Sequence, residues 1–96
     1  MKLLALERDV PGVVAAQFTS EILRAEASRA WALHQAGVIR ELYFRADAHA
    51  AVLVLECAGV AEAEAALASL PLVAAGLISF EVIPLTAYPG FARLFG

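Results

Sequence analysis

The stretch "VIRELYFRADAHAAVLVLEC" (residues 38–57) decides the fold, because it contains two extended segments joined by a short loop. Residues 38–45 and 51–57 are rich in β-branched, aromatic and aliphatic side chains, which favour strands. The segment between them, "ADAHA" (46–50), has the length of a hairpin loop. The sequence therefore predicts an antiparallel pair of strands in the middle of the chain.

A helix is expected on each side of this hairpin. Residues 15–36 are rich in Ala, Leu, Glu and Arg, and Gly37 follows as the residue expected just past a helix end. Residues 60–70 have apolar side chains at helical spacing, and Pro71 ends their regular course. The hairpin is therefore flanked by two helices.

Two further strands complete the pattern. Residues 2–8 and 77–85 are predicted strands, and "DVPG" (9–12) turns the chain out of the first one. The order β-α-β-β-α-β is typical of the ferredoxin-like fold, an α+β fold with a four-stranded antiparallel sheet and both helices on one face. We expect a single domain over residues 1–96, with a C-terminal tail at 86–96.

The composition is unusually apolar for a short chain. Of its 96 residues, 61% are apolar, against about 45–50% in an ordinary soluble domain. The predicted strands are too apolar for the sheet face without helices to stay in water. Two such sheets meeting face to face would close a dimeric α+β barrel, so we expect a homodimer or a larger homo-oligomer. The aromatic tail is expected to pack on its own domain or on the partner.

Charge and motif content argue against several partners. The formal net charge is −3 and no run of Lys or Arg occurs, which argues against nucleic acid. The longest stretch without a charge, residues 65–80, is too short to span a membrane and contains Pro71 and Gly76. Cys57 is the only cysteine, and no metal or cofactor motif is present. We expect a cytoplasmic protein that needs no cofactor, no metal, no membrane and no nucleic acid.

Glu26 has an unexpected place in the predicted helix of residues 15–36. Taking about 100° of rotation per residue and Phe18 as zero, Ile22 falls at about 40° and Glu26 at about 80°. Glu26 is therefore at the centre of the apolar stripe. An unpaired ionised carboxylate there would be costly, so it must be paired, hydrogen-bonded, wetted by a cavity or protonated.

Three interpretations of Glu26 stay open. It is a structural ion pair or hydrogen bond between helix and sheet, a carboxylate that lines a pocket, or a side chain that reaches solvent on a tilted helix. Its candidate partners are Arg40, Tyr43 and Arg45 on the next strand, His34 near the edge of the same stripe, and Arg29, which can turn outward.

The strand at 38–45 has two unlike faces. Alternation groups Ile39, Glu41, Tyr43 and Arg45 on one face, and Val38, Arg40, Leu42 and Phe44 on the other. If the second face meets the helices, Arg40 is the natural partner of Glu26. The first face would then line the interior of the dimer, where Glu41, Tyr43 and Arg45 would shape a ligand site.

Two further polar residues are candidates. Glu81 lies between Phe80 and Val82 in an apolar strand. It is either an edge-strand or interface charge, or a carboxylate of the site. His49 follows Asp47 in the hairpin loop, where it is an ordinary polar residue unless the loop lies at the mouth of a pocket.

Several short motifs occur between the middle of the first helix and Pro89. They are "AGVIREL" (36–42), "SLPL" (69–72) and "FEVIPL" (80–85). With these motifs the chain resembles the muconolactone δ-isomerase family. The residues that look like matches to the family are Glu26, Gly37, Arg40, Leu42, Leu70, Pro71, Leu72 and Glu81.

The resemblance implies a cofactor-independent isomerase that moves a double bond within a butenolide ring, in the catabolism of aromatic compounds. Such chemistry needs a base for an acidic carbon proton, and a cation or hydrogen-bond donor for the enolate oxygen. On this resemblance Glu26 or Glu81 would be the base, and Arg40 or Tyr43 would hold the oxyanion. The substrate would be a lactone or a small carboxylate.

Two alternatives come from the residues alone. The lack of a strong catalytic motif fits a non-catalytic dimeric module for ligand binding or assembly. The aromatic residues, Trp31 among them, would line the pocket of a cofactor-free oxygenase on the same fold. Trp31 falls at about 220° on the helical wheel, however, which suits an interface better.

Overall fold

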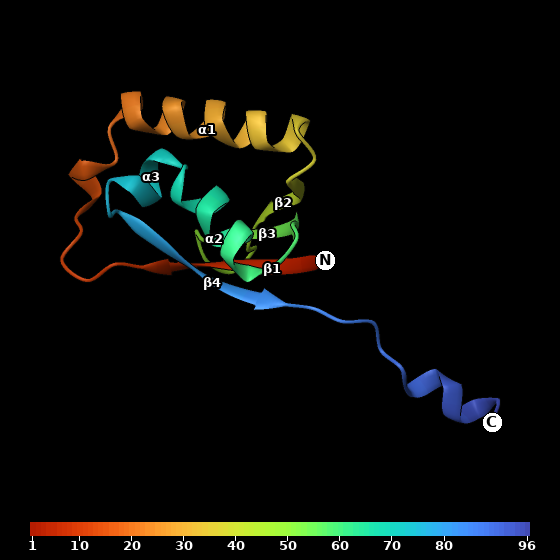
Figure 1. Cartoon of the computed structure of the whole chain (residues 1–96). Coiled ribbons are helices and arrows are strands. Elements are labelled where there is room, and N and C mark those ends of the chain that lie inside the picture. Colours follow the sequence, from red (N-terminus) through yellow and green to blue (C-terminus); the bar gives the residue numbers. More distant parts are fainter.

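The computed structural model describes residues 1–96 and contains one four-stranded antiparallel sheet (Figure 1). Its strands are β1 (Lys2–Asp9), β2 (Ile39–Phe44), β3 (Ala51–Glu56) and β4 (Ile78–Pro84). The strand order is β2-β3-β1-β4, with every neighbouring pair antiparallel. The two edges of the sheet are therefore β2 and β4.

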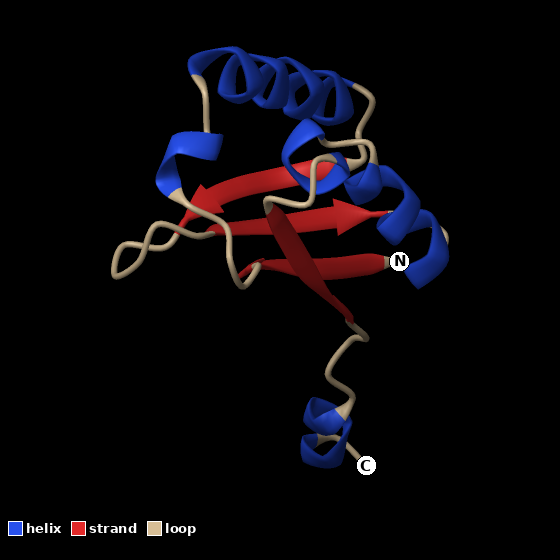
Figure 2. Cartoon of the chain, turned by 90° about the vertical axis from the view of Figure 1, so that its left-hand side faces the viewer, coloured by secondary structure: helices blue, strands red, loops and turns tan.

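Three helices cover one face of this sheet, as Figures 1 and 2 show. They are α1 (Ser20–Gln35), α2 (Val60–Ala68) and α3 (Pro71–Ala74), and the short 3₁₀ turn η1 (Ala15–Gln17) precedes α1. This two-layer arrangement is the ferredoxin-like α+β fold. The fold class predicted from the sequence is confirmed.

The long helix begins later than its sequence pattern predicts. Residues 15–17 form η1 by themselves, and α1 starts at Ser20. Thr19 is the reason, because its side-chain oxygen accepts a hydrogen bond from the Ile22 N–H at 3.2 Å and caps the helix. A capping residue has an extended backbone, which separates the two helical segments.

The end of α1 lies where the sequence predicts it, at Gly37. This residue has a φ of +80°. Its N–H donates to the His34 carbonyl, and the Val38 N–H donates to the Leu33 carbonyl, both at 3.0 Å. These two bonds form a Schellman motif, whose left-handed residue is usually glycine.

We expect Gly37→Ala to lower the free energy of unfolding by about 1 kcal/mol. The new methyl group would lie 3.7 Å from the Arg40 guanidinium, an ordinary contact distance, so the cost comes from the left-handed backbone. Urea unfolding followed by circular dichroism measures the change. An unaltered unfolding midpoint would contradict this role of Gly37.

The main core lies between the sheet and the helices. On the helix-facing side of the sheet, the residues that expose 2% or less of their surface are Leu3, Ala5, Ile39, Leu53 and Leu55. The register places Leu3 opposite Leu55 and Ala5 opposite Leu53, so these side chains share one face. Leu67 and Leu70 from the helical layer pack against them.

The other side of the sheet, which we call the open sheet face, carries no helix (Figure 2). Its half-buried apolar residues are Leu4, Leu6, Val52, Val54 and Ile83. They form one patch, because Leu4 lies opposite both Val54 and Ile83 in the register. An apolar sheet face of this kind usually packs against another surface.

β2 departs from regular alternation at Arg40. Ile39 lies opposite Leu55 and Glu41 opposite Val54, so Arg40 is an extra residue in a β-bulge. Ile39 is on the helix-facing side and exposes 1% of its surface, whereas Glu41 is on the open sheet face. The predicted grouping of Ile39 with Glu41 is therefore wrong, because a bulge interrupts the alternation on which it relied.

Beyond the bulge the predicted faces of β2 are confirmed. Leu42 lies opposite Leu53 on the helix-facing side, and Tyr43 lies opposite Val52 on the open sheet face. Leu42 and Tyr43 are still 50% and 55% exposed. Both belong to an edge strand, which has a neighbour on one side only.

The C-terminal tail extends away from the body of its own chain (Figure 1). The Leu85 N–H donates to the Lys2 carbonyl at 3.0 Å, and the chain then runs out to the short turn η2 (Gly90–Leu94). The exposed large side chains of the tail are Tyr88, Phe91, Leu94 and Phe95. Packing on its own domain, one of the two expectations from the sequence, is therefore wrong.

Candidate active site

Glu26 is half-buried where α1 approaches α3. Its Oε1 accepts a hydrogen bond from the Leu72 N–H at 2.9 Å. Leu72 is in the first turn of α3, where N–H groups have no partner within the helix. Pro71 before it has no N–H, so Leu72 is the first donor that α3 offers. The helix therefore turns Glu26 inward, as its place on the apolar stripe predicts.

The surroundings of Glu26 favour its protonated form. Burial raises the pKa of the Glu26 carboxyl, the Leu72 hydrogen bond lowers it, and the negative charge of Glu7 raises it, in that order of size. The net effect is a pKa above the ordinary value of 4.5. A raised pKa suits a proton-transfer base, because it brings the titration of the group closer to neutral pH.

The expected ion pair between Glu26 and Arg40 is absent. The Arg40 Nε donates instead to the Gly37 carbonyl at 2.6 Å, just past the end of α1. The ion pairs of the chain are Met1 amino group with Glu56, Arg8 with Glu81, and Arg45 with Asp47. No cation neutralises Glu26, and a main-chain hydrogen bond within the helical layer takes the place of the predicted pair.

Arg40 and Tyr43 come together elsewhere, in an open groove of about 520 Å³ between α1 and β2. The residues that border this α1–β2 groove are Ala27, Ala30, Trp31 and His34 from α1, and Arg40, Glu41, Leu42 and Tyr43 from β2. A guanidinium, an imidazole, a phenol and an indole therefore surround one space. The Glu41 carboxylate borders the same space and accepts the hydrogen bond of the Tyr43 hydroxyl, so Arg40 is the one side chain of the groove that carries a fixed positive charge.

Hydrogen bonds hold the polar side chains of the groove. His34 Nδ1 lies 2.8 Å from the Ile39 carbonyl oxygen, which can only accept, so Nδ1 donates and Nε2 is free. The Tyr43 hydroxyl donates to Glu41 at 2.6 Å, and this bond raises the pKa of Tyr43. The sequence interpretation considered His34 only as a partner of Glu26. The sequence does contain a signal for the place of His34. Trp31 and His34 are three residues apart on the helix, so their rings lie on the same side, with centroids 5.8 Å apart.

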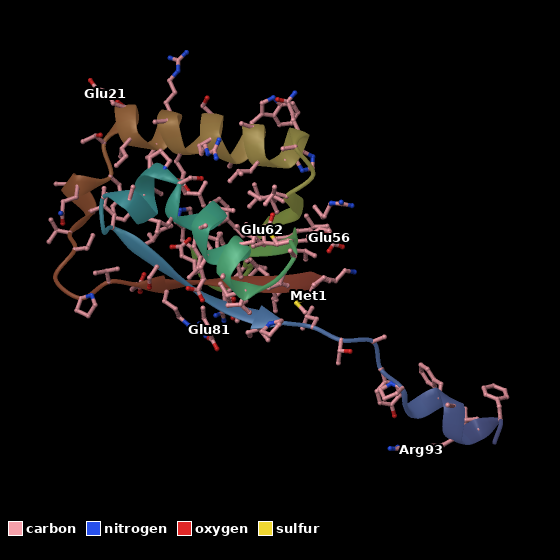
Figure 3. The ribbon with its side chains drawn as sticks, in the orientation of Figure 1. Met1, Glu21, Glu56, Glu62, Glu81 and Arg93 are labelled. Carbon is pink, nitrogen blue, oxygen red and sulfur yellow. The ribbon has the colours of Figure 1, made fainter.

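Glu81 lies on the opposite side of the sheet from Glu26. It is opposite Leu6 in the register, on the open sheet face, and its carboxylate pairs with Arg8. Figure 3 shows Glu81 pointing away from the helices. Within one chain it is an exposed ion pair on the edge strand β4, which is one of the two interpretations that the sequence left open.

The four candidate site residues do not form one cluster within a single chain. Glu26 lies under α1, Arg40 and Tyr43 border the α1–β2 groove, and the sheet separates Glu81 from Glu26. One link exists through α1, because Ala30, one turn after Glu26, borders the groove. Glu26 and the groove therefore occupy neighbouring flanks of the same helix.

Other reactive side chains are engaged elsewhere. His49 stacks on the Phe44 ring with centroids 4.6 Å apart, and Asp47 pairs with Arg45 in the same hairpin loop. Burial raises the pKa of the Cys57 thiol, which disfavours the reactive thiolate.

No three His, Cys, Asp or Glu side chains gather as a metal site. None of the helices combines the length and apolar character that crossing a membrane requires.

We expect the stability conferred by residue 26 to depend on pH. The folded chain binds the Glu26 proton more tightly than the unfolded chain, so this contribution to stability is fully present below the ordinary pKa of 4.5. It is lost as the pH rises through the raised pKa. Glu26→Gln should therefore become more stable relative to wild type from about pH 4 to about pH 7. Urea unfolding of both proteins at the two pH values tests this, and a change in the opposite direction would contradict it.

The structure matches a crystal structure of muconolactone isomerase with a TM-score of 0.72 and 23% sequence identity, over 93% of this chain and 92% of that one. At this identity the match shows the fold. No curated protein matches the sequence. The family model described as muconolactone delta-isomerase matches residues 3–90. This chain therefore belongs to the muconolactone delta-isomerase family.

Proposed function

We propose that this protein is a cofactor-independent isomerase that moves a double bond in a lactone or a small carboxylate, with Glu26 as the base. Membership of the isomerase family supports the class of reaction. The observation that carries the proposal is the Glu26 carboxyl, which is half-buried, has a raised pKa and has no cation partner. Leu72 fixes its Oε1, and its Oε2 accepts no hydrogen bond from the chain.

The proposed reaction is a proton transfer without a redox step. Glu26 removes the proton from the ring carbon γ to the lactone carbonyl, and the electron pair of that C–H bond moves into the ring. The resulting dienolate carries its negative charge on the carbonyl oxygen. A proton then returns to the carbon α to the carbonyl, so the double bond has moved and no atom is gained or lost. A carboxyl with a raised pKa suits both removal and return of the proton.

Arg40 and Tyr43 are proposed to hold the negative end of the substrate. A guanidinium is a suitable donor for a carboxylate or an enolate oxygen, and the Tyr43 O–H would exchange its present acceptor, Glu41, for the substrate oxygen. The groove that they border is also lined by Ala27 and Ala30, which follow Glu26 on α1. For Glu81 to be the base, the substrate would have to lie on the open sheet face, where Arg8 already neutralises that carboxylate. Glu26 is therefore the preferred base.

The proposal includes a homodimer or a larger homo-oligomer. Its support is the open sheet face, whose apolar patch is left uncovered by the chain, and the tail, whose aromatic residues find no contact on the body. Two open sheet faces packed together would form an α+β barrel, and each tail would pack on the other copy. A cytoplasmic location and a place in aromatic catabolism belong to the same proposal and rest on the family alone.

A non-catalytic module for ligand binding or assembly is the second candidate. The observation that favours it is the separation of Glu26, the Arg40 and Tyr43 pair, and Glu81 into three places within one chain. Such a protein would bind a small carboxylate in the α1–β2 groove without converting it.

The deciding experiment compares purified wild-type protein and Glu26→Gln on muconolactone, with the product followed by NMR. Conversion by wild type that the variant loses supports the isomerase. Calorimetry that detects binding of muconolactone without conversion by wild type supports the module. Oxygen consumption with a quinol-like substrate, measured on the same samples, would instead identify a cofactor-free oxygenase.

A further inference from the structure

One flank of α1 forms a wall of the α1–β2 groove. The side chains of this wall come from four positions that share one side of the helix, namely Ala27, Ala30, Trp31 and His34. Trp31 exposes 59% of its surface, and its ring centroid lies 5.8 Å from that of His34. The wall therefore presents two aromatic rings beside two small side chains, a surface that suits a flat molecule.

The His34 ring of this wall is fixed in one tautomer. Its Nδ1 lies 2.8 Å from the carbonyl oxygen of Ile39, the first residue of β2, and a carbonyl oxygen only accepts, so Nδ1 carries the proton. In the neutral ring Nε2 is then a hydrogen-bond acceptor, and no group of the chain donates to it. The partner of such an acceptor is an O–H or N–H group, whereas a carboxylate has no proton to donate.

Arg40 supplies the fixed positive charge of the groove. Its Nε donates to the Gly37 carbonyl at 2.6 Å, which fixes one side of the planar guanidinium. The two terminal nitrogens donate no hydrogen bond within the chain and are suitable donors for a carboxylate. The pKa of the nearby Glu56 is lowered mainly by its hydrogen bond from the Met1 amino group, and less by charges that include Arg40. Glu56 therefore has its own partner.

Glu41 limits how much negative charge the groove accepts. Its carboxylate borders the same space and accepts the Tyr43 hydroxyl at 2.6 Å. One positive and one negative group therefore face a ligand. A single carboxylate on the ligand can bind to Arg40, but a second one would have no cation and would lie in the field of Glu41.

We propose that the α1–β2 groove binds a flat, unsaturated monocarboxylate that also carries a hydroxyl group. The carboxylate binds to the terminal nitrogens of Arg40, the hydroxyl donates to His34 Nε2, and the flat body packs against Trp31. The groove, at about 520 Å³, has the volume of a small-molecule site. A preference of the isomerase for hydroxylated substrates rests on the proposed function, whereas binding in the groove does not.

The test adds four probes to the full chain: benzoate, 3-hydroxybenzoate, 4-hydroxybenzoate and terephthalate. Trp31 is the only tryptophan, so its indole N–H gives one signal in ¹H–¹⁵N NMR that reports on the groove. The better of the two hydroxybenzoates should bind about tenfold more tightly than benzoate, the usual effect of one hydrogen bond. Terephthalate, with its second carboxylate, should bind more weakly than benzoate. An unchanged Trp31 signal, or equal Kd values for benzoate and both hydroxybenzoates, would overturn the proposal.

His34→Phe tests the acceptor. The variant keeps an aromatic ring without a nitrogen, so the hydroxybenzoate should lose its advantage while benzoate binds within about twofold of wild type. His49→Phe is the matched control, because His49 is the other histidine and stacks on Phe44 in the hairpin loop. It should keep the advantage. A hydroxyl preference that survives in folded His34→Phe would contradict the role of Nε2, and if this variant does not fold, the four probes on wild type decide.

Arg40→Met tests the positive charge. It keeps a long side chain without the guanidinium and should weaken the binding of every carboxylate probe by about tenfold or more. Arg24→Met is the matched control, because Arg24 is exposed on α1 and does not border the groove. It should bind the probes like wild type. Equal losses in the two variants would assign the effect to the net charge of the chain and would overturn the place given to Arg40.

The ligand class and the proposed function fail separately. Probe binding with the expected hydroxyl preference, together with no conversion of muconolactone by wild type, would leave the groove as a binding site and remove the isomerase. Conversion of muconolactone that depends on Glu26, without any hydroxyl preference of the probes, would remove the ligand class and leave the isomerase.

Discussion

Glu26→Gln is expected to lower kcat/KM for muconolactone isomerisation by about 10²- to 10⁴-fold, the usual contribution of a general base. Glutamine has the shape of glutamate, and its side-chain oxygen can still accept the Leu72 N–H hydrogen bond. It cannot take a proton from carbon at neutral pH. The loss should therefore appear in kcat, with the fold unchanged.

The control for this experiment is Glu21→Gln. It removes the same charge from the same helix, at an exposed position in the first turn of α1. Its activity should equal that of wild type. Activity in Glu26→Gln within about twofold of wild type would remove Glu26 from the role of base and would direct attention to Glu81 on the open sheet face.

Val54→Asp is expected to dissociate the proposed oligomer. Val54 is in the middle of the open sheet face, opposite Leu4 and Glu41. An unpaired carboxylate in an apolar interface costs about 3 kcal/mol or more, which corresponds to a roughly 100-fold rise in Kd. Val54 does not belong to the core between the sheet and the helices. Circular dichroism should therefore show that the monomer keeps its secondary structure.

Sedimentation velocity at micromolar concentration measures this effect. Wild type should sediment as a dimer or larger species and Val54→Asp as a monomer. Val14→Asp is the matched control, because Val14 is 59% exposed before η1, and it should sediment like wild type. A monomeric wild type, or a Val54→Asp variant that keeps the wild-type sedimentation, would contradict the assembly through the open sheet face.

The fold could be predicted largely from local patterns. β-branched and aromatic runs gave the strands, and the glycine after residue 36 gave the end of α1 with its Schellman motif. The start of α1 was missed because the alanines at 15 and 16 favour a helix while Thr19 caps a separate one. The bulge at Arg40 was also missed. It is a property of the pairing between β2 and β3, which the residues of one strand do not reveal.

The site could be predicted only in part. The helical wheel placed Glu26 inside, because burial depends on the local period of the helix. The donor to Glu26 is the main-chain N–H of Leu72, which is 46 residues away and is defined only by tertiary packing. Arg40 donates to the Gly37 carbonyl, three residues earlier in the chain, instead of pairing with the distant Glu26 carboxylate. The sequence pattern shows Glu7 only as part of a strand. Its effect on the pKa of Glu26 depends on how β1 is placed in the sheet.

The central claim is that the proton moved in the reaction passes through the Glu26 carboxyl. The most direct test measures two quantities on the same wild-type sample across pH, namely the ¹³C NMR titration of the Glu26 carboxyl and kcat/KM for muconolactone. The pH profile of kcat/KM reports the ionisations of the free enzyme. The acid limb of this profile should therefore have the same midpoint as the Glu26 titration, and that midpoint should lie above pH 4.5. Full activity at a pH where the NMR signal shows Glu26 to be protonated would contradict the claim.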